Sequence, residues 1–405
     1  MTSRGGTNDL HGSLFYYFRN EQLQANDWFA NSRGYDRGKL RQNRPGGTVG
    51  GPVLKNKTFF FVSYERLRLV TPSVIITSVP DLQTRQSAAA SVRRYLNAFP
   101  LPNGAEQDDG AAEFHAVVAN PSSSDSMSLR VDHSITSKMT LFARYSLTPT
   151  SSLSRGSGFS SPNVLTQQDS HSNAGTVGLT IAGSSGSIND TRINYSQSSS
   201  RNFSIMDAFG GATPLVESSV FPAGVTSNTG QFSLNALGVG GYSFGGRSRN
   251  DQTQINVVHS FTKAVGAHTV KLGADYRRIM PTNFRMPYTL NVTFNGLSGS
   301  NGALASGIAT NAQVAANVPT IYPVYTNVSM YAQDTWRATD RTTLTYGLRW
   351  DINPAPGVRQ GDRPFALAES TTRSATGSVC WRRVPAPWRW PTSLPGTGSS
   401  QVSPC

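Results

Sequence analysis

Apolar and polar residues alternate with a period of two through many short segments of the chain. In residues 128–133, Leu129 and Val131 share one side, while Arg130 and Asp132 share the other. A period of two is typical of a β-strand that presents two different faces. The pattern therefore predicts strands with one apolar and one polar face.

Three pairs of these segments are separated by short polar turns, and we expect each pair to form an antiparallel hairpin. The pairs are 128–133 with 140–147, 254–261 with 270–277, and 325–336 with 343–351. Further strand candidates are 10–18, 46–53, 58–65, 176–182, 191–198 and 290–295, about a dozen strands in all.

Other connections are much longer, namely 67–126, 199–252 and 296–324. Transmembrane β-barrels have short turns at one rim and long loops at the other. The sequence thus predicts an all-β fold, an antiparallel transmembrane β-barrel with long extracellular loops. Within those loops, 81–99 is expected to be a helical decoration and 238–246 a flexible glycine-rich loop.

Charged residues within the alternating segments are predicted to face the water-filled interior of the barrel, because their neighbours are apolar. These candidate lumen residues are Arg130, Asp132, Arg144, Lys271, Asp275, Arg277 and Arg349. Aromatic residues near strand ends are predicted at the membrane interface, where barrels carry aromatic girdles. These candidates are Phe60, Tyr64, Trp336 and Trp350.

Composition agrees with many strands and turns, since 37% of residues are hydrophobic, 15% are charged and 38 are glycine. No stretch of about 18 apolar residues is present, but a barrel strand needs only about 9–11 residues of alternating character. The net charge of +13 raises a nucleic-acid function. Because the basic residues are spread out and form no helical stripe or dense arm, we expect no nucleic-acid partner.

Enzymatic chemistry has no support in the sequence. The six histidines lack the spacing of zinc ligands, and there is neither a Gly-x-Ser-x-Gly elbow nor a phosphate loop. The two cysteines, Cys380 and Cys405, are too few for a disulfide framework. We therefore expect no enzyme, and no catalytic, cofactor-binding or metal-binding residues.

Short strings at the expected strand positions resemble TonB-dependent receptors, in particular their Oar-like branch. The strings are TNDLHGSL (7–14), GGTVGGPV (46–53), KNKTFFFVSYE (55–65), LRVDH (129–133), LFARYS (141–146), HTVKLGAD (268–275), YAQD (331–334) and TYGLR (345–349). The resemblance extends over roughly residues 3 to 352.

This resemblance implies a Gram-negative outer-membrane barrel for energised uptake or sensing of a large ligand. Residues 1–9 would be the junction with a plug, 10–352 a partial barrel wall, and 353–405 a disordered or out-of-frame tail rich in Pro, Trp and Arg. The family's barrels have about 22 strands, so we expect this chain to lack the plug and the C-terminal part of the barrel. The implied partners are outer-membrane lipid, the barrel assembly machinery, the ligand, and TonB through the plug, against which the lumen residues would also pack.

Two alternatives stay open. The strands could form a soluble or surface-anchored β-rich adhesin, which would remain soluble and monomeric without detergent. The chain could also be a non-functional fragment of a transporter, which the flanking DNA would reveal.

Overall fold

The computed structural model describes residues 5–156, 158–183, 186–298, 303–317 and 319–361, and β-strands dominate it. The strands are β1 His11–Asn20, β2 Arg41–Leu54, β3 Thr58–Pro80, β4 Ala111–Thr136, β5 Met139–Arg155, β6 Val164–Ala182, β7 Ser187–Met206, β8 Gly230–Ala236, β9 Gly240–Val265, β10 His268–Asn283, β11 Tyr288–Phe294, β12 Asn311–Ala316, β13 Pro323–Thr339, β14 Thr342–Ile352 and β15 Gly357–Val358. The α-helices are short: α1 Trp28–Ser32, α2 Leu82–Ser87, α3 Ala90–Asn97 and α4 Glu217–Val220.

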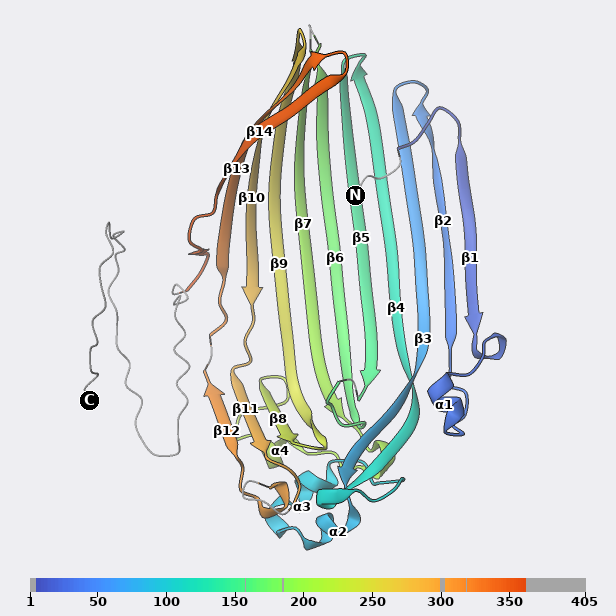
Figure 1. The fold of residues 1–405 in the computed structure, drawn as a ribbon, viewed down its shortest axis with the longest axis vertical. Helices are drawn as coiled ribbons and strands as arrows, with labels where there is room; N and C mark the ends of the chain where they lie inside the picture. The colour runs from blue at the N-terminus through green and yellow to red at the C-terminus, as the bar shows by residue number, and fades with distance from the viewer. Residues whose placement is uncertain (1–4, 157, 184–185, 299–302, 318, 362–405) are drawn as a thin grey trace, which may run out of the picture. The chain divides into compact units, whose positions relative to one another are not determined.

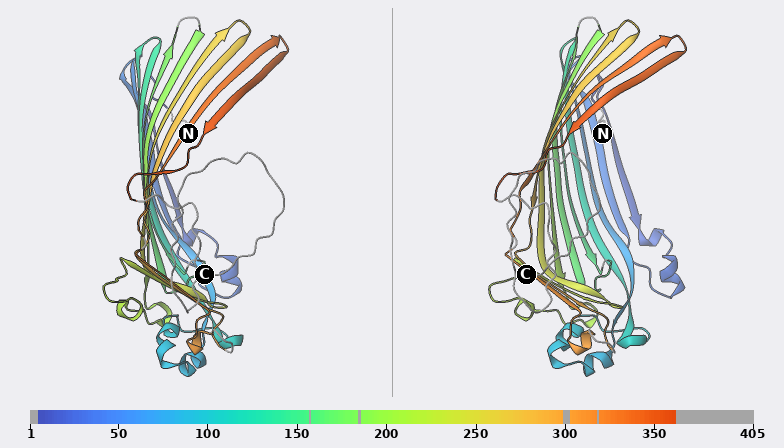
Figure 2. Two further views of the ribbon diagram at one scale, coloured as in Figure 1. Left: turned by 90° about the vertical axis from the view of Figure 1, so that its left-hand side faces the viewer. Right: turned by 60° about the vertical axis from the view of Figure 1, so that its left-hand side comes forward.

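All fifteen strands belong to one hydrogen-bonded network, whose main path runs β1-β2-β3-β4-β5-β6-β7-β9-β10-β13-β14. Neighbours along this path are antiparallel, and the sheet they form is curved (Figures 1 and 2). Among the described residues, β1 pairs only with β2, and β14 pairs only with β13. The two end strands β1 and β14 therefore do not pair with each other. The sheet is therefore an open wall, as the sequence predicted for a partial barrel.

The register of neighbouring strands sorts the side chains onto two faces. Arg130 on β4 lies opposite Arg144 on β5, and Leu129 lies opposite Tyr145. Because directly paired residues share a face and successive residues alternate, the whole sheet has two distinct faces. We call the face with Arg130 the charged face and the face with Leu129 the apolar face.

Tight turns join the strands at one end of the sheet (Figure 1). β4 ends at Thr136 and β5 begins at Met139, while β9 ends at Val265 and β10 begins at His268. Gly266 takes the left-handed conformation, with φ of 59°, that such a turn needs. We call this end the short-turn rim and the opposite end the long-loop rim.

The long connections contain more structure than the sequence predicted. β3 and β4 continue far into the expected loop 67–126, and β7, β8 and β9 occupy much of 199–252. The expectation of a flexible loop at 238–246 was wrong, since β9 begins at Gly240 and pairs with β8. Cross-strand pairing of distant segments, which local composition does not report, creates these extensions.

These connections pack around one hydrophobic core at the long-loop rim, which we call the loop cap. Its most buried side chains include Leu96 on α3, Phe99 just after α3, Leu234 on β8, Tyr242 on β9 and Leu304. The expected helix 81–99 is divided into α2 and α3, and both contribute buried residues to the cap.

Arg85 ties the loop cap together from within. It is 5% exposed and donates to the carbonyl oxygens of Pro80 at 2.9 Å, Phe99 at 3.1 Å and Pro100 at 2.5 Å. Burial lowers the pKa of Arg85 to about 10.

Among the described residues no helix is long and apolar enough to cross a membrane.

Candidate functional site

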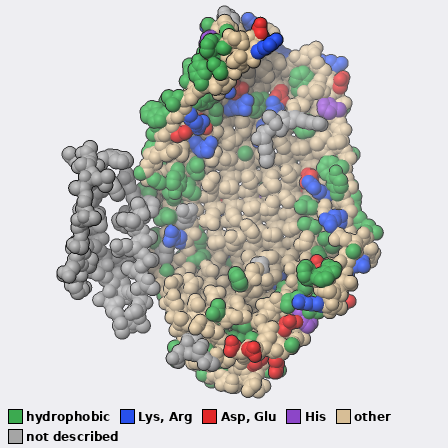
Figure 3. Space-filling model, viewed as in Figure 1, with side chains coloured by type: hydrophobic (Ala, Val, Ile, Leu, Met, Phe, Trp, Pro, Cys, Tyr) green, Lys and Arg blue, Asp and Glu red, His purple; other side chains and the backbone are tan. Residues whose placement is uncertain are grey.

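The charged face carries the seven predicted lumen residues, and most of them form short ion pairs along single strands. Arg130 lies 2.7 Å from Asp132, and Arg277 lies 3.7 Å from Asp275. Arg349 likewise lies 3.0 Å from Asp351. Ionic side chains gather on the concave side of the sheet toward the short-turn rim (Figure 3).

Two predicted residues are cations without a carboxylate partner in the described part of the chain. The Arg144 Nε atom is buried and has no hydrogen-bond partner there. The Nζ atom of Lys271 lies 6.0 Å from the centre of the Tyr331 ring, and Lys271 forms no ion pair among the described residues. The charges within each ion pair largely cancel, whereas Arg144 and Lys271 add positive charge that no paired carboxylate in the described residues offsets.

Further charged residues of this face were not predicted from the sequence. Asp190 and Arg192 on β7 pair at 2.9 Å, and Arg192 shares a row of the sheet with Asp275 through Val258. Asp351 was also missed. The available signal was an Asp and an Arg two residues apart, a spacing that puts both on one face of a strand.

The first described residues lie against this charged face. A side chain on Gly5 would come within 3.1 Å of the Asp132 carboxylate. The Asn8 side chain then anchors the segment to the β2–β3 turn. Its Nδ2 atom donates to Oδ1 of Asn56 at 2.6 Å, and its Oδ1 atom accepts from the backbone N–H of Asn56 at 2.7 Å.

The four predicted interface aromatics all lie on the apolar face. Phe60 pairs with Val131, Tyr64 with Met127, Trp350 with Met330 and Trp336 with Leu344, so alternation carries Phe59 and Phe61 to the charged face instead. The apolar face is openly exposed, with Leu272 at 45% and Leu348 at 77%. That the four aromatic residues lie at the membrane interface stays a prediction.

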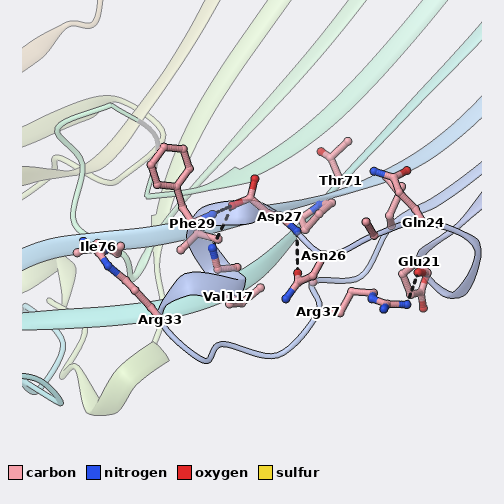
Figure 4. A pocket seen from close by; sticks show the side chains of 16 residues that line it. Glu21, Gln24, Asn26, Asp27, Phe29, Arg33, Arg37, Thr71, Ile76 and Val117 are labelled. Atoms are coloured by element: carbon pink, nitrogen blue, oxygen red, sulfur yellow. Dashed lines mark hydrogen bonds between the residues drawn. The ribbon is translucent and has the colours of Figure 1, made fainter.

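A separate pocket of about 580 Å³ opens between the β1–β2 connection and the β3–β4 ribbon at the long-loop rim (Figure 4). Its apolar wall includes Leu40, Pro72 and Val117. Gly38 is required there, because any Cβ at this position would overlap the Pro72 side chain.

Polar residues surround the pocket opening. Asp27 caps α1 by accepting from the amides of Phe29 at 2.9 Å and Ala30 at 3.1 Å. Arg37 donates to the backbone oxygen of Glu21 at 2.9 Å, and Arg33 makes no side-chain hydrogen bond or ion pair in the described ranges.

An antiparallel sheet with an exposed apolar face, a charged face and unequal rims defines the wall of a transmembrane β-barrel. The chain belongs to the outer membrane beta barrel domain family, whose sequence profile matches residues 2–387. The protein is thus an outer-membrane β-barrel protein. No curated protein matches its sequence.

Solved structures with a similar fold include outer-membrane transporters and receptors. The transporter YddB from Escherichia coli has 11% identity and a TM-score of 0.49 over 86% of this chain and 39% of its own. A mutant of the ferric enterobactin receptor PfeA from Pseudomonas aeruginosa has 13% identity and a TM-score of 0.43 over 87% of this chain and 40% of its own. The chain therefore spans about 40% of the length of these proteins.

Proposed function

We propose that this chain forms part of the wall of a TonB-dependent outer-membrane receptor of the Oar-like branch, which imports or senses a large ligand. The observation that carries the proposal is the charged face near the short-turn rim, with the segment from Gly5 to Asn8 laid against it. That arrangement suits a wall that holds a plug inside the barrel.

Surplus cations on the charged face support this proposal. Arg144 and Lys271 have no carboxylate partner in the described part of the chain, and a partly buried charge is costly unless it is paired. Acidic residues of a plug would supply the partners. The ion pairs around Arg130, Asp275 and Arg349 hydrate and stiffen the wall, and each contributes little stability because solvent screens it.

In this proposal the ligand binds at the long-loop rim. Loops on a rigid scaffold carry recognition without disturbing the wall. The loop cap presents a stable surface built from three separate connections, because they share one core. TonB, acting through the plug, would then supply energy for import.

Uptake by cells tests the proposal. The full-length polypeptide is produced in Gram-negative cells with and without TonB, in medium containing peptides, oligosaccharides and metal chelates. Mass spectrometry follows their depletion. We expect at least one compound to be depleted only when both the receptor and TonB are present. Identical depletion with and without TonB would contradict the proposal.

A further inference from the structure

We infer that the pocket behind α1 is a binding site for a small anionic, partly apolar molecule of roughly dipeptide to tetrapeptide size. Its volume of about 580 Å³ lies within the range of small-molecule sites. This inference deepens the proposed function, because it names a ligand class for the long-loop rim.

The negative charge of the ligand follows from the arginines. Arg33 and Arg37 both line the pocket and are exposed. Arg37 is held by a neutral backbone oxygen, and neither arginine forms an ion pair in the ranges that the structure describes. A guanidinium group binds a carboxylate with two parallel hydrogen bonds, so these side chains suit an anionic head group.

The carboxylates of the two acidic residues that line the pocket contact groups other than Arg33 and Arg37. The Asp27 carboxylate accepts two backbone amides of α1 and forms no ion pair with Arg33 or Arg37 in the described residues. Glu21 lines the pocket, and its carboxylate lies 3.7 Å from Arg41, which is not a lining residue. The Oε2 atom of Glu21 is buried and has no hydrogen-bond partner in the described chain. A ligand with an N–H or O–H donor at this end would satisfy that oxygen.

An apolar body fits between these polar ends. Pro72, Val74 and Val117 from the β3–β4 ribbon form one wall, and Leu40 and Ala30 face them from the β1–β2 connection. Such a mixture of a mainly apolar lining and a few placed polar groups is typical of small-molecule sites.

Two probes that differ only in charge test the inference on the full-length purified protein. The first probe is N-acetyl-Leu-Phe, which carries a C-terminal carboxylate. The second is the same dipeptide with a neutral C-terminal amide in its place, and calorimetry measures the dissociation constant of each. We expect the acid to bind about tenfold more tightly than the amide, as one bidentate charged contact provides. Equal binding of the two probes, or no binding of either, overturns the inference.

Variants assign the effect to the pocket. In R33Q/R37Q the preference for the acid should fall to within about twofold, whereas the matched loss of two cations at the other rim, K55Q/R341Q, should leave it unchanged. Ala25→Trp, at an exposed lining position, should block both probes without removing a charge. A preference that survives in R33Q/R37Q contradicts the inference.

Binding and transport fail independently in these experiments. If the probes bind as expected while TonB makes no difference to uptake, the transport proposal is wrong and the site stands. If uptake depends on TonB but the probes do not discriminate by charge, the site is wrong and the transport proposal stands.

Discussion

Charged side chains in this protein do two different jobs, depending on whether they are paired within their own strand. On the charged face Arg130, Asp275 and Arg349 have carboxylate or guanidinium partners two residues away, so their fields largely cancel. In the loop cap, Arg155 and Asp207 pair although they come from different parts of the chain. There an ion pair fixes how the chain folds at the long-loop rim.

Arg155 and Asp207 are the clearest example. Their side chains form two parallel contacts of 2.8 and 2.5 Å, and the guanidinium lies 4.3 Å from the ring centre of Phe209. The hydrogen bonds from Arg155 hold the pKa of Asp207 below its usual range. This pair joins the end of β5 to the segment that follows β7.

The depressed pKa of Asp207 predicts acid sensitivity at this junction. The pair contributes stability above about pH 4, the ordinary pKa of an aspartate, and loses it as the pH falls through the lower folded value. Amide exchange around Phe209, corrected for its intrinsic pH dependence, should therefore accelerate as the pH falls below about 4. Asp207→Asn should exchange faster at neutral pH and lose this acid step; an unchanged profile in the variant would show that the pair has no such role.

At the scale of the strand, glycines covered by aromatic rings recur on the charged face. Phe15 lies over Gly46, Phe142 over Gly178, and Tyr331 over Gly273, each pair directly opposite across neighbouring strands. A ring that covers a cross-strand glycine protects backbone that has no side chain of its own. Arg130 adds a second layer, with its guanidinium 4.6 Å from the ring centre of Phe142.

Gly178 and Gly175 provide a matched test of this arrangement on one strand. A Cβ at Gly178 would overlap the Phe142 ring, whereas one at Gly175 would meet nothing within 4 Å. We expect Gly178→Ala to lower the free energy of unfolding by about 1–3 kcal/mol, the usual cost of overpacking, and Gly175→Ala to leave it unchanged or higher.

Denaturant titration of the full-length protein in lipid vesicles measures both. Adding Phe142→Leu to Gly178→Ala should recover part of the loss, because the smaller side chain leaves room for the new methyl group. Equal stability of the two alanine variants would mean that ring cover does not require a glycine.

Alternation along the chain was enough to predict the faces of the strands, but not their full lengths. Leu129 and Arg130 were assigned to opposite faces from their order alone, because period two is a local property. The extension of β3 from Glu65 to Pro80 could not be predicted, because it depends on pairing with residues 111–126 of β4. The pocket behind α1 was missed for the same reason, since its walls are distant in sequence.

At the scale of the molecule, a wall and a cap are stabilised by different forces. The wall has its apolar side chains exposed on one face and relies on hydrogen bonds between strands and on surrounding lipid. The loop cap has an ordinary buried core of Leu, Phe, Val and Tyr side chains. Its three connections should therefore unfold together as one unit.

Leu234 tests that cooperativity because it is 1% exposed in the cap core, while Leu237 in the same connection is 71% exposed. Leu234→Ala should destabilise the cap by about 2–5 kcal/mol, as cavities in a core do. Hydrogen exchange should then accelerate in α3, β8 and β11 together, and Leu237→Ala should change none of them. Acceleration confined to β8 would show that the connections are independent.

The central claim is that the apolar face meets lipid while the charged face meets water. Spin labels placed singly along β10 from Val270 to Arg277, in the full-length protein in vesicles with Cys380 and Cys405 replaced by serine, test it most directly. The account predicts that labels at 270, 272, 274 and 276 are most accessible to oxygen dissolved in the lipid, and that labels at 271, 273, 275 and 277 are most accessible to a water-soluble nickel chelate. Accessibility that does not alternate along these eight positions would contradict it.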